Sequence, residues 1–306
     1  MRDRPSTVTR LVRPLGPEGL TAKAGSVLDW DVPLAADSFQ AFTPQHYLLI
    51  GIFLAGALGL VVLGRSRRSR LADDQFDRTF AVAIVVVTVP SQLYQLSPWD
   101  FSLSSSLPLD LCDFAWIVGA WALWTHDPVP TALIYYWGLT LTTQAIITPS
   151  LGEAFPDPRY FMFWSMHFLI VWAAVYLTFG LGRGPGWREY RITLAVTLAW
   201  AVLAYTFDVV VDVNYGYLVR KPGSASLLDL LGPWPVYVLA SLGILLAGWA
   251  LITWPWVAWR RDAQAAREGA SPLPDAPVTI SMRWRASRTS TASASVRDSP
   301  VPTLCR

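Results

Sequence analysis

Long apolar stretches are the feature that most limits how this chain can fold. Seven segments of the 306-residue sequence reach about 18 residues with few or no charges, the length that an α-helix needs to cross a bilayer. They cover 45–63, 79–96, 107–124, 131–148, 160–179, 192–213 and 234–256. Because lipid offers no partners to backbone N–H and C=O groups, each segment is expected to be helical. The sequence therefore predicts an all-α, polytopic membrane helix bundle with about seven transmembrane helices.

Two of these stretches are less apolar than the others. The third carries Asp110 and Asp113, and the sixth carries Asp208 and Asp212. Carboxylates inside a bilayer are costly and rare. A six-span bundle, in which one of these stretches lies partly outside the bilayer, is therefore the alternative.

The composition excludes several other classes of protein. A chain that is 53% hydrophobic and only 15% charged is too apolar for a soluble domain, and a net charge of +2 predicts no nucleic-acid partner. Two cysteines, one of them in a polar tail, do not make a disulfide framework. The sequence has no phosphate-binding glycine loop and no paired Cys-x-x-Cys, and its three histidines fall on both sides of the predicted bundle. We therefore expect no cofactor and no metal site.

Basic residues predict the orientation of the bundle. The loop between the first two stretches contains five arginines: Arg65, Arg67, Arg68, Arg70 and Arg78. This excess of positive charge predicts that the loop lies in the cytoplasm. The N-terminus is then outside, in a multi-pass protein of the cell membrane. Residues 1–43 are expected to be a polar, flexible segment, 44–259 the helix bundle, and 260–306 a disordered cytoplasmic tail.

Polar side chains gather in the predicted outer half of the bundle. Cys112 lies five residues beyond Leu107, and His167 lies seven beyond Tyr160, so both are roughly 7–10 Å deep at 1.5 Å per residue. The inner halves are almost purely Leu, Val, Ala and Trp, and His126 reads as part of a solvated inner turn. This distribution predicts one polar cavity open towards the outer leaflet.

Each polar group also has a structural explanation. Cysteine is often a small buried apolar residue, and histidine or glutamine in a span often forms hydrogen bonds between helices. However, a thiol and an imidazole at matched depth also fit acyl-transfer chemistry, in which the imidazole takes the thiol proton.

Several short strings resemble the bacterial YwaF-type membrane proteins, which are related to the eukaryotic transmembrane protein 164 family. The strings are spread over roughly 40–256, and their order and spacing carry the resemblance more than any single one. They include Thr43-Pro44-Gln45-His46, Leu107-Pro108-Leu109-Asp110-Leu111-Cys112-Asp113, Tyr136-Trp137-Gly138, Gln144-Ala145, Phe155-Pro156, Asn214-Tyr215 and Lys221-Pro222.

The resemblance implies an activity. The eukaryotic branch of that family is described as cysteine-dependent acyltransferases that move fatty acyl chains onto lysophospholipids, and its cysteine and histidine match Cys112 and His167. The family is also distantly similar to membrane hydrolases that use a threonine and a histidine. This chain departs from the family pattern at Asp110, where a histidine is expected, and at Asp208, where a neutral polar residue is expected. A carboxylate beside Cys112 opposes thiolate formation.

These observations define the expected site. Cys112 is the nucleophile and His167 the base, with Asp110 or Asp113 orienting the imidazole. The partner is a membrane lipid, either a phospholipid acyl donor or a lysophospholipid. Seven polar residues are expected to line the substrate site: His46, Gln92, Gln144, Arg159, Asp208, Asn214 and Lys221. The alternative is a non-enzymatic membrane protein that transports or binds a solute or has a structural role.

Overall fold

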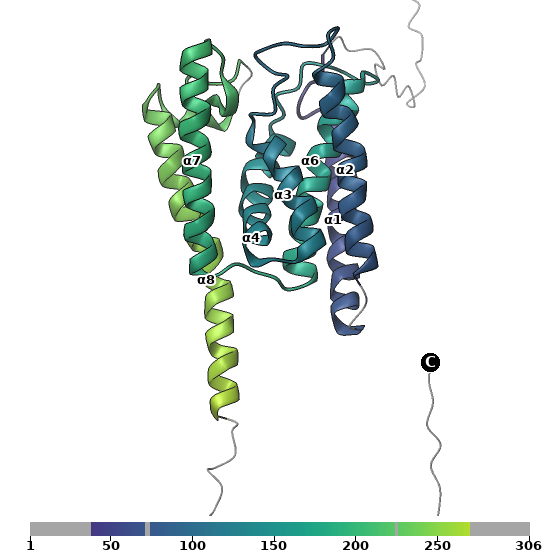
Figure 1. The fold of residues 1–306 in the computed structure, drawn as a ribbon, viewed down its shortest axis with the longest axis vertical. Helices are drawn as coiled ribbons and strands as arrows, with labels where there is room; N and C mark the ends of the chain where they lie inside the picture. Colours follow the sequence, from purple (N-terminus) through teal and green to yellow (C-terminus); the bar gives the residue numbers. More distant parts are fainter. Residues whose placement is uncertain (1–37, 71–73, 224–225, 270–306) are drawn as a thin grey trace, which may run out of the picture. The chain divides into compact units, whose positions relative to one another are not determined.

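The computed structural model describes residues 38–70, 74–223 and 226–269, and its regular structure there is entirely helical (Figure 1). The elements are α1 Pro44–Arg70, α2 Gln75–Gln95, α3 Leu111–Thr125, α4 Pro128–Tyr136, η1 Trp137–Thr142, α5 Thr143–Ile147, α6 Pro158–Val175, η2 Tyr176–Gly180, α7 Trp187–Val211, η3 Tyr215–Tyr217, η4 Leu227–Leu231 and α8 Val236–Gly269. The π-helical turn η1 joins α4 to α5 without a break, and η2 extends α6 in the same way. Each of the seven predicted apolar stretches is therefore helical, which confirms the all-α prediction.

Among the described residues, five helices are long and apolar enough to cross a membrane, so the chain is a multi-pass membrane protein. These candidate spans are Pro44–Arg68, Gln75–Gln95, Pro158–Gly180, Trp187–Val211 and Val236–Arg267. The remaining apolar helix, Leu111–Thr125, has 15 residues. It measures roughly 22 Å at 1.5 Å per residue, shorter than the hydrocarbon core of about 30 Å.

The segment formed by α4, η1 and α5 lies at the centre of the packing. Every residue from Pro130 to Gly138 is buried. Its side chains pack in the main apolar cluster together with residues of α2, α3, α6 and η2. Protein covers this segment more completely than it covers the candidate spans formed by α1, α2, α7 and α8.

Hydrogen bonds connect this central segment to α7 and α8. The Tyr136 hydroxyl lies 2.6 Å from that of Thr253, and the Trp137 indole donates to Thr197 at 2.8 Å. Polar side chains of neighbouring helices pair in this way because lipid offers them nothing. The last part of α8, from Ala258, belongs to a second compact unit.

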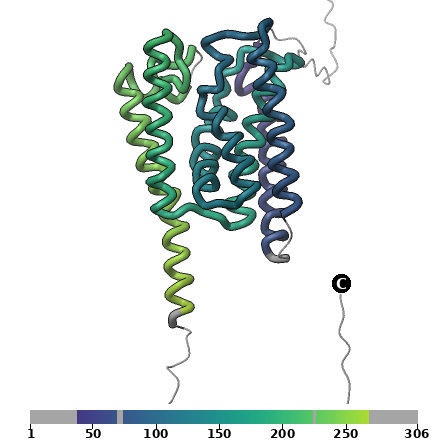
Figure 2. Tube along the Cα trace, viewed as in Figure 1, coloured from purple at the N-terminus to yellow at the C-terminus, as the bar shows by residue number. Residues whose placement is uncertain are grey.

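Within residues 38–257, successive helical segments run in alternating directions, so their ends form two sides (Figure 2). We call the first the basic side: there Arg65 donates to the Phe179 carbonyl at 3.3 Å, and Arg183 donates to the His126 carbonyl at 3.5 Å. The other is the loop side, formed by residues 96–110, 148–157, 212–223 and 226–235 of the connections. The predicted chemical residues lie on or near the loop side.

The structure describes residues on both sides of the expected bundle boundaries. Phe39 is buried against His46 and Trp164, so the packing that the structure describes includes residues before 44. At the other end, α8 continues past Arg260 and ends at Gly269. The rest of the expected flexible segment and tail, 1–37 and 270–306, lies outside the described residues.

Candidate functional site

Cys112 lies in the first turn of α3. The helix begins at Leu111, later than the start expected at 107, so the thiol is next to a helix N-terminus and not well inside a span. Its sulfur lies 3.9 Å from the hydroxyl of Thr142 in η1. The side chain is half-buried and packs against the main apolar cluster. The unpaired N–H groups of a first helical turn are suited to stabilising negative charge.

The two aspartates that flank Cys112 hold the backbone in place. One Asp113 carboxylate oxygen accepts the backbone N–H of Asp110 at 3.0 Å, which is one half of a capping box. Asp110 in turn accepts the backbone N–H of Gly216 at 2.9 Å. Neither hydrogen bond involves His167. These carboxylates therefore fix the start of α3 and attach it to the loop after α7.

His167 is buried in α6, and one of its ring nitrogens is already used. Its Nδ1 lies 2.6 Å from the carbonyl oxygen of Phe163, and its ring lies tilted by 34° against the Phe163 ring with 4.2 Å between centroids. A carbonyl oxygen only accepts, so Nδ1 carries the hydrogen and Nε2 keeps its lone pair. Thus the imidazole is held in the tautomer that a general base requires.

The described residues contain no hydrogen bond between Cys112 and His167. The two side chains belong to α3 and α6, which pack against each other, and η1 contacts both helices. The structure thus brings the two helices together, while the polar contact of the sulfur is with Thr142.

The loop after α7 clamps the turn that precedes Cys112. The Tyr215 hydroxyl donates to the Leu103 carbonyl at 2.7 Å and accepts the Leu107 N–H at 3.2 Å. The Trp200 indole donates to the Leu109 carbonyl at 2.9 Å. Burial raises the pKa of Tyr215, so this phenol stays protonated and able to donate. Sequence reasoning did not assign Tyr215, Trp200 or Thr142 to the site.

Asp208, in α7, holds the loop that contains Tyr215 in place. It is only 1% exposed, and its Oδ1 accepts the backbone N–H of Tyr215 at 2.8 Å. Its Oδ2 is buried and has no hydrogen-bond partner within the described part of the chain. Asp212, by contrast, is exposed, and its carboxylate lies 3.4 Å from the Arg220 guanidinium.

The expected phosphate-binding cations are paired with carboxylates. The Arg159 guanidinium lies 2.9 Å from Asp100 and 3.1 Å from Glu153. The Lys221 ammonium lies 3.5 Å from Asp229. The Ser226 backbone N–H and this ammonium lower the pKa of Asp229 below its usual range. A lipid phosphate would have to compete with these acids.

The other expected polar residues hydrogen-bond to backbone or lie beside the site. The fully buried His46 has its Nε2 2.9 Å from the Ile146 carbonyl and accepts the Phe42 N–H at Nδ1. The Gln92 amide donates to the Ser106 carbonyl at 3.0 Å. The Asn214 amide bonds to Arg220 and Val219 within the loop after α7, and Gln144 is half-buried in α5.

Comparison with known protein families identifies the chain. The sequence model of the TMEM164 family matches residues 41–253, well over half of the chain. This chain belongs to the TMEM164 family. No curated protein and no solved structure matches it. The family match confirms the resemblance seen in the sequence, and it covers Cys112, His167 and the loop that clamps the start of α3.

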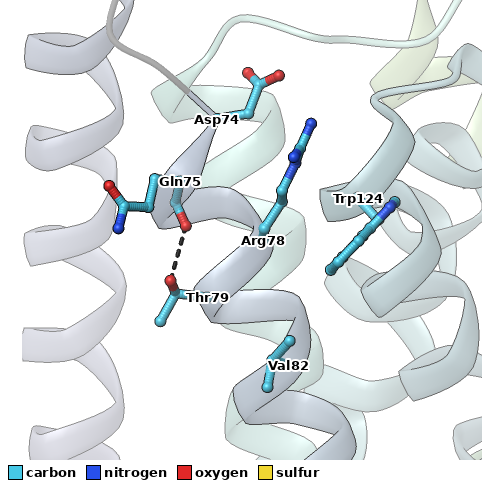
Figure 3. A pocket seen from close by; sticks show the side chains of 6 residues that line it. All are labelled: Asp74, Gln75, Arg78, Thr79, Val82 and Trp124. Carbon is cyan, nitrogen blue, oxygen red and sulfur yellow. Dashed lines mark hydrogen bonds between the residues drawn. The ribbon is translucent and has the colours of Figure 1, made fainter.

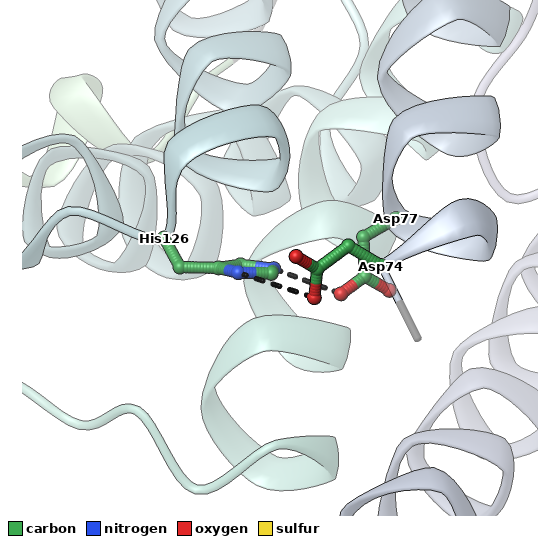
Figure 4. A group of neighbouring side chains, drawn as sticks. All are labelled: Asp74, Asp77 and His126. Carbon is green, nitrogen blue, oxygen red and sulfur yellow. Dashed lines mark hydrogen bonds and ion pairs between the residues drawn. The ribbon is translucent and has the colours of Figure 1, made fainter. Parts of the chain in front are cut away.

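The family region also contains a polar cluster that sequence reasoning missed (Figure 4). It lies on the basic side, just outside the bounds expected for the second and third spans, so the expectation of apolar inner helix halves does not cover it. Asp77, 4% exposed, accepts a hydrogen bond from the Tyr176 hydroxyl, and its Oδ2 lies 2.8 Å from Nε2 of His126. His126 is therefore not part of a freely solvated turn. The sequence contains a signal for this cluster: Asp74 and Asp77 have i, i+3 spacing just before the second stretch, and His126 follows the third.

Proposed function

We propose that this TMEM164 family protein transfers acyl groups between membrane lipids, with Cys112 as nucleophile and His167 as general base. The observation that carries the proposal is the hydrogen bond from Nδ1 of His167 to the Phe163 carbonyl. It leaves a lone pair on Nε2, on a helix that packs directly against the helix of Cys112. The chain belongs to the family whose resemblance implied this pair of residues, and the matched region includes both of them.

The reaction proceeds in two steps. Nε2 of His167 takes the proton of the Cys112 thiol while the sulfur attacks the ester carbonyl of a phospholipid. The ester C–O bond breaks, and the leaving lysolipid oxygen takes the proton back from the imidazolium. A hydroxyl of a second lysolipid, or water, then attacks the thioester and releases the thiol. The N–H groups in the first turn of α3 stabilise the oxyanion. Rotation of the side chains must first bring Nε2 to the sulfur.

The two flanking aspartates have a positioning role in this scheme. Asp110 and Asp113 each accept a backbone N–H group. The group that orients the imidazole of His167 is therefore the Phe163 carbonyl. Their negative charges oppose a free thiolate, so proton removal accompanies attack.

The substrate enters from the loop side. The arginines where α1 ends and α2 begins favour a cytoplasmic basic side. In this orientation the loop side, with Cys112 near it, faces the outer leaflet of the cell membrane. Arg159 and Lys221 lie on that side, where a lipid phosphate exchanges with Asp100 or Asp229. The helical membrane setting suits a substrate that stays in the bilayer.

Acyl-probe labelling of membranes tests this proposal. Wild type is expected to form an adduct that hydroxylamine releases, because hydroxylamine cleaves thioesters. Cys112→Ser and Cys112→Ala should lose this adduct, whereas Cys305→Ser, which changes the only other cysteine, should keep it. Hydroxylamine-sensitive labelling that persists in both Cys112 variants would rule out this nucleophile.

A second candidate, a non-enzymatic structural or solute-binding role, is favoured by one observation. Asp110, Asp113, Arg159 and Asn214 all hydrogen-bond or pair with other groups of the chain, as residues that hold a bundle together do. Comparing membrane lipids of a deletion strain with those of the complemented strain separates the two. Unchanged acyl composition would favour the structural role.

A further inference from the structure

We propose that Asp74, Asp77 and His126 bind a divalent transition-metal ion on the basic side of the bundle. This site lies at the start of α2 and the end of α3, whereas Cys112 lies at the start of α3. The proposal is therefore independent of the acyl-transfer function.

The three side chains converge from two helices (Figure 4). One ligand atom from each lies within 4.8 Å of the other two. Nε2 of His126 is 2.8 Å from Asp77, and its Nδ1 is 4.0 Å from Asp74. Bonds of about 2.0–2.2 Å in a tetrahedral site hold ligand atoms roughly 3.3–3.6 Å apart. An imidazole binds one ion through one nitrogen only, so Asp74 has to rotate towards the nitrogen that faces Asp77 for all three side chains to surround one ion.

Outer partners already hold the buried ligand in place. The Tyr176 hydroxyl donates to Oδ1 of Asp77, which leaves Oδ2 facing His126. Arg67 approaches the same Oδ1 at 4.0 Å, on the Tyr176 side of the carboxylate. Hydrogen bonds that orient ligating carboxylates are a regular feature of protein metal sites.

The third ligand is exposed and gives the site an entrance. Asp74 is the residue before α2, yet its side chain makes no capping hydrogen bond. Figure 4 shows its carboxylate beside the imidazole instead. Asp74 also lines a surface pocket of about 520 Å³ together with Gln75, Arg78, Thr79, Val82 and Trp124 (Figure 3). An ion can reach the cluster from this pocket, and water can complete its coordination.

The chemistry of the ligands selects the class of ion. One imidazole nitrogen and two carboxylate oxygens suit Zn²⁺ and similar divalent transition ions. Ca²⁺ and Mg²⁺ prefer all-oxygen sites with more ligands. Two carboxylates beside one arginine also provide the negative charge that a divalent ion requires.

Direct metal titration tests the site. Full-length, tag-free protein in detergent is stripped with a chelator, then titrated with Zn²⁺ by calorimetry and with Co²⁺ by visible absorption. We expect one ion per chain, Co²⁺ bands of a four- or five-coordinate N/O site, and a higher unfolding temperature with Zn²⁺. Asp74→Asn should weaken binding at least about tenfold, and His126→Gln should abolish the Co²⁺ bands.

Asp127→Asn is the matched control, because it removes the same charge from the exposed residue next to His126. It should bind Zn²⁺ as wild type does. The exposed Asp74 can be changed without disturbing packing, so Asp74→Asn remains informative even if His126→Gln does not fold. No stoichiometric binding by wild type, or equal binding by wild type and Asp74→Asn, would overturn the proposal.

Discussion

The carboxylate of Asp208 accepts a 2.8 Å hydrogen bond from the backbone N–H of Tyr215, and both residues are almost fully buried. Tyr215 in turn bonds to Leu103 and Leu107, just before α3. A buried acid in α7 thereby fixes the loop that covers the start of the cysteine-bearing helix.

Replacing Asp208 should destabilise the protein in a graded way. Asp208→Ala removes the acceptor of the buried Tyr215 N–H, which costs about 1–3 kcal/mol. Asp208→Asn keeps that acceptor and replaces the unpaired oxygen, so the loss should be smaller. Thermal unfolding in detergent measures both variants. Equal losses would mean that the hydrogen bond to Tyr215 contributes little.

Replacing His167 should remove acyl transfer without unfolding the helix. His167→Gln deletes the base at Nε2, so transfer from a labelled phospholipid in reconstituted liposomes should fall by about 10²–10⁴-fold. Ser165→Ala is the control, because Ser165 lies on the same helix and its hydroxyl bonds only to backbone carbonyls of that helix. Wild-type rates in His167→Gln would exclude it as the base.

Arg159 and Asp100 should be energetically coupled. A double-mutant cycle of Arg159→Ala and Asp100→Ala should give about 1 kcal/mol in unfolding measurements, because the pair is partly buried. The pair Arg188 and Glu189 provides a comparison: its arginine side chain is 70% exposed, and we expect weaker coupling. If Arg159 instead serves mainly to bind lipid phosphate, its coupling to Asp100 will be near zero.

Gly216 should not tolerate a side chain. Its φ of +63° is unfavourable for other residues, and an added Cβ would lie 2.5 Å from the Trp200 ring. Gly216→Ala should therefore cost about 1–3 kcal/mol and displace the indole from the Leu109 carbonyl. Unfolding temperature and Trp200 fluorescence report the change. Gly223→Ala, which meets nothing within 4 Å, should behave as wild type.

The helices were predictable because length and apolarity alone determine them in a membrane. The start of α3 was placed too early, although Asp110 and Asp113 carry the i, i+3 spacing of a capping pair. Hydropathy also does not distinguish an apolar face covered by protein from one covered by lipid. The central position of α4 therefore followed only from the structure.

The contacts between residues far apart in the sequence could not be predicted from the sequence alone. Asp77 and His126 are 49 positions apart, and Asp77 and Tyr176 are 99 apart. The sequence shows the spacing of the aspartates, but only the packing of α2, α3 and α6 shows that Asp77 meets His126 and Tyr176. The same holds for Asp208 and Tyr215, whose contact depends on the path of the loop.

The burial of α4 also changes which substitutions it can accept. On a helix such as α1, most side chains are exposed to the surroundings, so one apolar residue can replace another at little cost. Between Pro130 and Gly138 every position is enclosed by neighbours, and a close-packed interior responds to volume as strongly as to polarity. Among family members, size and shape should therefore vary least in the segment that hydropathy alone would have placed against lipid.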